Sequence, residues 1–294
     1  MTRLRISIFP GGANAPLYLG LDRGWFAEAG LELDVTEVRS SQEQLSSWSR
    51  GETDVMHTAP DHLLRARRAH DPVAVRQDAF GELSVYLREG RPEDARWAVD
   101  DARSGFALVL RALLEDACGV SPPSDRLVSM GGTKQRFDAL IAEQPEVDGT
   151  ALHPPFDALA ADAGLIRLAG HLDHYPKLAT LVTVVRRADL GSDAIEAYLQ
   201  VSDRGVDELS RGGERAIVAA LQSRGLPQAV AEAGARGLAG PAGFSSERRV
   251  DRESLAAVAE LRQRFDPAWE RPVAIQELLE TSTGEGNPNS RRSR

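Results

Sequence analysis

Two histidines stand in the same sequence context about ninety positions apart, and imidazole is the side chain best suited to acid–base chemistry near neutral pH. His57 lies in GETDVMHTAPDHLL (51–64), and His153 lies in PEVDGTALHPPFDAL (145–159). In each stretch an acidic pair precedes a short apolar run that ends at the histidine. A proline and an aspartate then open a new apolar stretch. A repeated phrase of this kind predicts two structural units of the same design.

The elements around His57 alternate between the strand pattern and the helix pattern. Period-two alternation marks the strands, and apolar residues at helical spacing mark the helices, which begin at capping residues and end at glycine. The predicted strands are 4–9, 31–38 and 55–58, and the predicted helices are 16–30 and 40–51, with Ser40 or Ser41 as the N-cap of the second.

The elements around His153 follow the same order. The predicted strands are 96–100, 126–130 and 149–153, and the predicted helices are 104–119 and 131–143. Each half is a β-α-β-α-β unit, whose crossovers require a parallel sheet with helices on both faces. Both histidines then lie at the carboxyl end of a strand, just before a helix N-terminus. In open α/β sheets this edge is where ligands bind.

The chain divides into two predicted lobes and a tail. Residues 179–187 supply one more strand, and most of the chain from Ser192 onward has helical spacing. We therefore predict an α/β fold with lobe one formed by 1–88 and 180–280 and lobe two by 89–179. Residues 281–294 have almost nothing to bury and are predicted to be disordered.

Composition and charge exclude several function classes. The net charge of −9 and the pI near 5.3 give no electrostatic footprint for nucleic acid or for an anionic membrane surface. The single Cys118 cannot form an intramolecular disulfide. No apolar run reaches the ~20 residues of a membrane span, and residues 1–12 do not resemble an export signal. The expected location is the cytoplasm, or outside it if this sequence is a processed mature form.

Four stretches carry a family resemblance. APLYLGLDRGWFAEAGLELDVTEV (15–38), RGETDV (50–55), FDALIAEQPEVDGTALHPP (137–155) and LATLVTVVRRADL (178–190) occur in the order found in the type 2 periplasmic solute-binding proteins of ABC importers. The resemblance is to the branch that contains the nitrate, taurine and alkanesulfonate binders and the thiamine-pyrimidine synthase-like proteins.

The resemblance implies a two-lobed protein that clamps a small organic or oxyanion ligand in a cleft between its lobes. An importer's membrane subunits are then possible partners, and no metal or cofactor is expected. Hydroxyl and N–H donors at helix N-termini suit an anion. Carried over residue by residue, the ligand-binding positions are Asn14, Pro16, Tyr18, Ser40, Ser41, Gln42, His57 and Thr58 in lobe one, and Ser104, Gly105, Gly132, Thr133 and His153 in lobe two.

Two other function classes stay open. The fold is similar to that of several intracellular lyases, so a cytosolic, cofactor-independent enzyme of the decarboxylase type, acting on a small carboxylate or aromatic acid, is the alternative. In that case His57 and His153 are the candidate catalytic acid and base. A histidine at a strand end is, however, more often a ligand donor or a packed structural residue. A ligand-sensing domain of a regulator is the third class.

Overall fold

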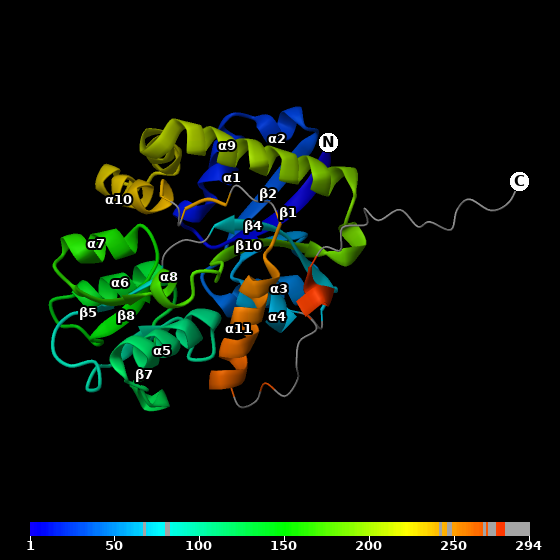
Figure 1. Cartoon of the computed structure of the whole chain (residues 1–294). Coiled ribbons are helices and arrows are strands. Elements are labelled where there is room, and N and C mark those ends of the chain that lie inside the picture. Colours follow the sequence, from blue (N-terminus) through cyan, green and yellow to red (C-terminus); the bar gives the residue numbers. More distant parts are fainter. Residues whose placement is uncertain are drawn as a thin grey trace, which may run out of the picture.

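The computed structural model describes residues 1–66, 69–79, 83–240, 243–245, 249–266, 269 and 275–279. Its named strands form two five-stranded sheets, each at the centre of one lobe (Figure 1). The predicted tail, 281–294, lies outside the described residues. Within the described residues, no helix is long and apolar enough to cross a membrane.

The first sheet has the strand order β2-β1-β3-β10-β4. Its first three strands are parallel, whereas β10 lies antiparallel between β3 and β4. The strands are β1 (Thr2–Ile8), β2 (Leu31–Glu37), β3 (Val55–Thr58), β4 (Pro72–Ala79) and β10 (Leu181–Arg186).

The second sheet has the order β7-β6-β8-β5-β9 and repeats the plan of the first. Parallel pairing joins β6 to β7 and to β8, while β5 pairs antiparallel with β8 and β9. The strands are β5 (Ser84–Leu87), β6 (Trp97–Val99), β7 (Leu127–Ser129), β8 (Gly149–Leu152) and β9 (Ile166–Gly170). The three predicted strands of each half are neighbours in one sheet, in the order β2-β1-β3 in the first sheet and β7-β6-β8 in the second. The repeated β-α-β-α-β plan is therefore confirmed.

Helices cover both faces of each sheet (Figure 1). One face of the first sheet packs on α1, α2 and α9, and the other on α3, α4 and α11. In the second lobe α5 covers one face of the sheet, and α6 and α7 cover the other. The helices are α1 (Ala15–Asp22), α2 (Trp25–Glu28), α3 (Ser41–Ser49), α4 (Pro60–Ala66), α5 (Gly105–Cys118), α6 (Thr133–Ile141), α7 (Phe156–Asp162), α8 (His171–His174), α9 (Asp193–Gln222), α10 (Gln228–Leu238) and α11 (Arg252–Phe265).

Two predictions about the elements need correction. The predicted helix 16–30 is two helices, because Gly24 adopts φ 71°, a left-handed conformation that ends α1 before α2 begins. Strands β4, β5 and β9 were not predicted, and β5 belongs to the second sheet although the predicted boundary placed 84–88 in lobe one. We therefore propose that the chain enters lobe two between β4 and β5, not at 88. It returns to the first sheet with β10.

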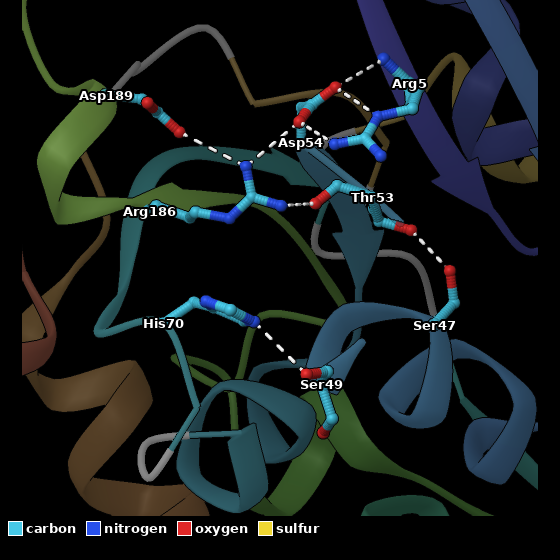
Figure 2. A network of polar contacts seen from close by, with 8 residues as sticks. All are labelled: Arg5, Ser47, Ser49, Thr53, Asp54, His70, Arg186 and Asp189. Atoms are coloured by element: carbon cyan, nitrogen blue, oxygen red, sulfur yellow. Dashed lines mark hydrogen bonds and ion pairs between the residues drawn. The ribbon is translucent and has the colours of Figure 1, made fainter. Parts of the chain in front are cut away.

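An ion-pair network ties the strands together at the amino end of β3 (Figure 2). Asp54 accepts hydrogen bonds from the Arg5 guanidinium of β1, and its Oδ1 lies 2.9 Å from Nη1 of Arg186 at the end of β10. Burial opposes ionisation of Asp54, but the hydrogen bonds from the two arginines outweigh it and lower its pKa to about 2. Arg186 also lies 3.5 Å from Asp189. The network fixes the relative positions of three strands at the edge opposite the predicted ligand site.

Candidate functional site between the lobes

The N-termini of α3 in lobe one and α5 in lobe two meet at the carboxylate of Asp100, which follows β6. The hydroxyl of Ser41 donates to Oδ2 of Asp100 at 3.1 Å, and the hydroxyl of Ser104 donates to Oδ1. Ser104 also caps α5, because its Oγ accepts a hydrogen bond from Ala107 N–H. One side chain of lobe two is thus bound by hydroxyls of both lobes.

The two lobes also touch where α4 passes the first residue of α5. A Cβ atom at position 105 would lie 2.4 Å from Cβ of Asp61, so α4 and the start of α5 approach each other more closely than a larger residue at this position allows. On the other side of α3, Ser40 Oγ accepts from Glu43 N–H at 3.2 Å and caps the helix as predicted. The backbone oxygen of Arg39 lies 4.0 Å from the Cβ position of Gly132 in lobe two.

A buried arginine holds the loop before α6. The Arg136 guanidinium donates to Gly131 O at 2.9 Å, to Thr133 Oγ1 at 3.2 Å and to Ala151 O at 3.2 Å. These acceptors are neutral, so burial lowers the pKa of Arg136 while the negative charge of Asp100 opposes that shift. Arg136 therefore joins the loop after β7 to the end of β8, the two places where the sequence predicts ligand contacts in lobe two.

His153 lies beside Phe106 at the start of α5, and their ring centroids are 4.5 Å apart in an edge-to-face arrangement. The following peptide bond, Pro154–Pro155, is cis. Pro154 packs against α10 of lobe one, where a Cβ atom on Gly237 lies 2.8 Å from its ring. Figure 1 shows α10 next to α7 at this end of the molecule. The end of β8 thus contacts both its own lobe and the other one.

His57 lies inside lobe one. Its Nδ1 is 2.9 Å from Oδ1 of Asn14, and its Nε2 is 2.6 Å from the hydroxyl of Tyr198 in α9. Asn14 Nδ2 donates to Phe9 O at 2.7 Å, so its Oδ1 is the acceptor for His57 Nδ1–H. Burial lowers the pKa of His57, which is the expected effect on a neutral imidazole sealed from water.

Thr58 and Tyr18 are buried as well. Thr58 Oγ1 donates to Gln44 Oε1 at 2.6 Å and lies 2.6 Å from Nδ1 of His62. The Tyr18 ring packs beneath Arg224, and burial raises the pKa of its hydroxyl to about 12. Four predicted ligand positions, Asn14, Tyr18, His57 and Thr58, therefore fix the N-terminal part of lobe one from within.

Helix α11 contacts both α4 and α5, and it joins the lobes through Arg262. Its guanidinium forms two hydrogen bonds with the Asp61 carboxylate, at 2.5 and 2.7 Å, and a third with Arg103 O at 2.6 Å. Asp266 lies 3.0 Å from it on the next turn. All three ionised side chains are buried. Removal of the arginine leaves the buried carboxylate of Asp61 without its cation, whereas Asp266 keeps Arg103 at 3.7 Å, so the Arg262–Asp61 pair is a strong link between α4 and α11.

A surface hollow of about 340 Å³ lies elsewhere, on the outer side of lobe one between α3 and α4. Of the predicted ligand positions only Gln42 lines it, together with Leu45, Ser46, Ser49, Arg50 and Arg65. The hollow is open to solvent, and neither Ser41 nor Asp100 lines it. Among the described residues, no three His, Cys, Asp or Glu side chains gather as metal ligands.

Comparison with solved structures shows what this architecture is. The ligand-binding component of an ABC-type import system from Staphylococcus aureus, solved with zinc bound, has a TM-score of 0.77 at 14% identity over 96% of this chain and 97% of that one. The alkanesulfonate-binding protein SsuA from Xanthomonas axonopodis, bound to MOPS, has a TM-score of 0.73 at 17% identity. The match covers 95% of this chain and 98% of that one. The chain has the fold of the type 2 solute-binding superfamily. The nitrate-binding protein NrtA from Synechocystis shares this fold. Its TM-score is 0.75 at 11% identity, over 95% of this chain and 86% of that one.

The sequence comparisons are consistent with this fold. A family model described as NMT1/THI5 like matches residues 13–78, which span α1 to most of β4. Comparison with the curated proteins found no match. The predicted two-lobed solute-binding fold is thus confirmed.

The structure places the predicted site residues in different parts of the solute-binding fold. Ser41, Ser104 and Gly105 lie where the lobes meet, with Ser40 and Gly132 beside them. Thr133 and His153 contact Arg136 and Phe106 of their own lobe. Pro16 is buried in α1, and Gln42 lines the surface hollow. Asn14, Tyr18, His57 and Thr58 lie inside lobe one.

Three further residues of this region were not predicted: Asp100, Arg136 and Arg262. Asp100 ends a predicted strand four positions before Ser104, the capping serine of the next helix, which was a usable signal. Arg136 and Arg262 lie within amphipathic helices, where sequence spacing does not distinguish a buried arginine from an exposed one.

Proposed function

We propose that this protein binds a small organic molecule or oxyanion between its lobes and that the lobes close over it. In this role it is the substrate-binding component of an ABC-type importer, whose membrane subunits are its partners. The observation that supports the proposal best is the hydrogen bond of Ser41, in lobe one, to Asp100 in lobe two. It shows that the two helix N-termini predicted to face a ligand lie within one side chain of each other.

The fold supports the same proposal. Solute-binding structures with TM-scores of 0.73 to 0.77 cover at least 95% of this chain, and their printed descriptions name an importer's ligand-binding component, an alkanesulfonate binder and a nitrate binder. Those ligands belong to those proteins. For this chain they define the chemical classes to screen first.

The lyase alternative depends on His57 and His153 as acid and base. Both ring nitrogens of His57 form hydrogen bonds inside lobe one, with Asn14 and Tyr198, and burial lowers the pKa of the ring. The imidazole is therefore neutral, and neither nitrogen is available to exchange a proton with a ligand. No contact among the described residues favours this alternative over ligand binding.

The test is a thermal-shift screen of the purified protein against aliphatic sulfonates, carboxylates, thiamine precursors and aromatic acids. A compound that binds the folded state raises the melting temperature, because binding stabilises that state by RT ln(1 + [L]/Kd), where [L] is the free ligand concentration. Mass spectrometry of each stabilising compound after incubation then separates binding from turnover. Recovery of the compound unchanged supports the binding role, and its consumption contradicts it.

A further inference from the structure

The carboxylate of Asp100 lies between the N-termini of two helices, one from each lobe. It follows β6 in lobe two, and it accepts one hydrogen bond from Ser41 of lobe one and one from Ser104 of its own lobe. Both hydroxyls belong to the first turns or caps of helices, α3 and α5. The partial positive charge at a helix N-terminus attracts anions. The chain's own carboxylate already occupies the position between these two N-termini.

The charge of Asp100 is not neutralised by contact. Among the described residues, no lysine, arginine or histidine forms an ion pair with it, and its two hydrogen-bond donors are neutral hydroxyls. The charge of Arg136 acts on Asp100 from a distance, but the hydrogen bonds of that guanidinium go to Gly131, Thr133 and Ala151. His62 is also close enough to sense Asp100, and burial favours the neutral imidazole there.

Two properties follow for this point between the lobes. A second negative charge placed beside Asp100 is repelled, and the repulsion grows as the lobes exclude water. The carboxylate also has spare capacity, because an ionised aspartate offers about four acceptor sites and only two are used here. A group that donates hydrogen bonds meets an acceptor that is already held in place by two serines.

We propose that Asp100 determines the ligand class: the site takes a molecule that presents an ammonium, an N–H or a hydroxyl to this carboxylate, and it discriminates against sulfonates, nitrate and other oxyanions. The inference rests on the proposed function and narrows the two ligand classes given there to one. Asp100 then acts both as the acceptor that orients the ligand and as the charge that excludes anions.

The test compares wild type, Asp100→Asn and Asp101→Asn, with methanesulfonate, nitrate and sulfate as probes. Asp101 is the matched control, because it is also acidic and exposed, and the one hydrogen bond that its carboxylate accepts from a described residue comes from the nearby Arg103 N–H at 2.8 Å. Affinities are measured by thermal shift and calorimetry at constant ionic strength, with sodium chloride as the salt control. We expect Asp100→Asn to bind at least one oxyanion tenfold or more tightly than wild type, and Asp101→Asn to match wild type.

Two results overturn the inference. One is a wild-type protein that binds the oxyanions as tightly as Asp100→Asn does. The other is an Asp100→Asn protein that gains nothing over Asp101→Asn. If Asp100→Asn does not fold, as judged by near-ultraviolet circular dichroism, Asp100→Ala takes its place. The proposed function fails separately: in that case neither wild type nor Asp100→Asn binds any of the three probes or any compound of the thermal-shift screen.

Discussion

The hydroxyl of Tyr198 in α9 donates a hydrogen bond to Nε2 of His57 in β3, with 2.6 Å between the two atoms. The donor direction follows from the other side of the ring, where Nδ1–H donates to Asn14 Oδ1 at 2.9 Å. His57 is therefore a neutral imidazole that connects the loop before α1 to the long helix α9. This relationship gives a structural role to a residue that the sequence places among the ligand positions.

Replacement of Tyr198 by phenylalanine removes the donor and leaves a buried nitrogen of His57 without a partner. We expect Tyr198→Phe to lower the free energy of unfolding by about 1–3 kcal/mol, measured by urea denaturation. Tyr175→Phe is the control, because the Tyr175 hydroxyl bonds to Asp116 at the surface. A Tyr198→Phe protein of unchanged stability but weakened ligand binding contradicts the structural role of His57.

Stability is expected to fall as the pH drops below about 6.5, the ordinary histidine pKa. Burial lowers the pKa of His62 to about 4 and also lowers that of His57. Between these pKa values the unfolded state binds more protons than the folded state does, so a fall in pH favours unfolding. Between pH 6.5 and 4, His62 alone contributes a loss on the order of 3 kcal/mol.

The measurement for this prediction is the free energy of unfolding from urea titrations at a series of pH values. His62→Gln should flatten the slope between pH 6.5 and 4, whereas the exposed control His174→Gln should keep it. Equal slopes in wild type and His62→Gln show that His62 titrates normally and contradict the burial argument.

Much of the fold was predictable from sequence because its signals are local. The capping residues Ser40 and Ser104, the period-two strands and the repeated histidine phrase specify the β-α-β-α-β units and their order. Strand β4 escaped detection for a physical reason: every residue in it is buried, including Arg76, which forms an ion pair with Asp203 of α9. A charged residue in a strand signals an exposed face unless its distant partner is known.

The candidate site was predictable only in part. Topology predicts that ligands bind at strand ends and helix starts, and the family resemblance named Ser41 and Ser104 among those positions. The direction in which a side chain points depends on neighbours that are distant in sequence. His57 lies 141 positions from Tyr198, and Asp61 lies 201 positions from Arg262, and such partners cannot be inferred from spacing.

Loss of Arg262 should destabilise the protein strongly. Arg262→Met leaves the carboxylate of Asp61 buried without its cation, and we expect a loss of roughly 3–5 kcal/mol in the free energy of unfolding. Arg264→Met is the matched control two positions away on α11, where the ion pairs with Glu115 and Asp116 are partly exposed. Its expected cost is about 0–1 kcal/mol. Similar losses in both variants contradict the view that Arg262 forms the principal ion pair between α11 and α4.

Arg136 should control the mobility of the loop before α6. In Arg136→Met the carbonyl oxygens of Gly131 and Ala151 lose their donor, so amide hydrogen exchange in residues 130–134 should accelerate about tenfold or more. Lys134→Met, which alters an exposed ion pair in the same helix, is the control. Unchanged exchange in Arg136→Met shows that the loop is held by other contacts.

The central claim is that a ligand closes the two lobes on each other, and solution X-ray scattering tests it most directly. The radius of gyration is measured without ligand and with a saturating concentration of a compound from the thermal-shift screen, with the Gly105→Leu variant as the control. Leucine at this position collides with Asp61, and we expect it to hold the lobes apart. We predict that ligand reduces the radius of gyration of wild type and not that of Gly105→Leu. Identical wild-type profiles with and without a bound ligand contradict the account.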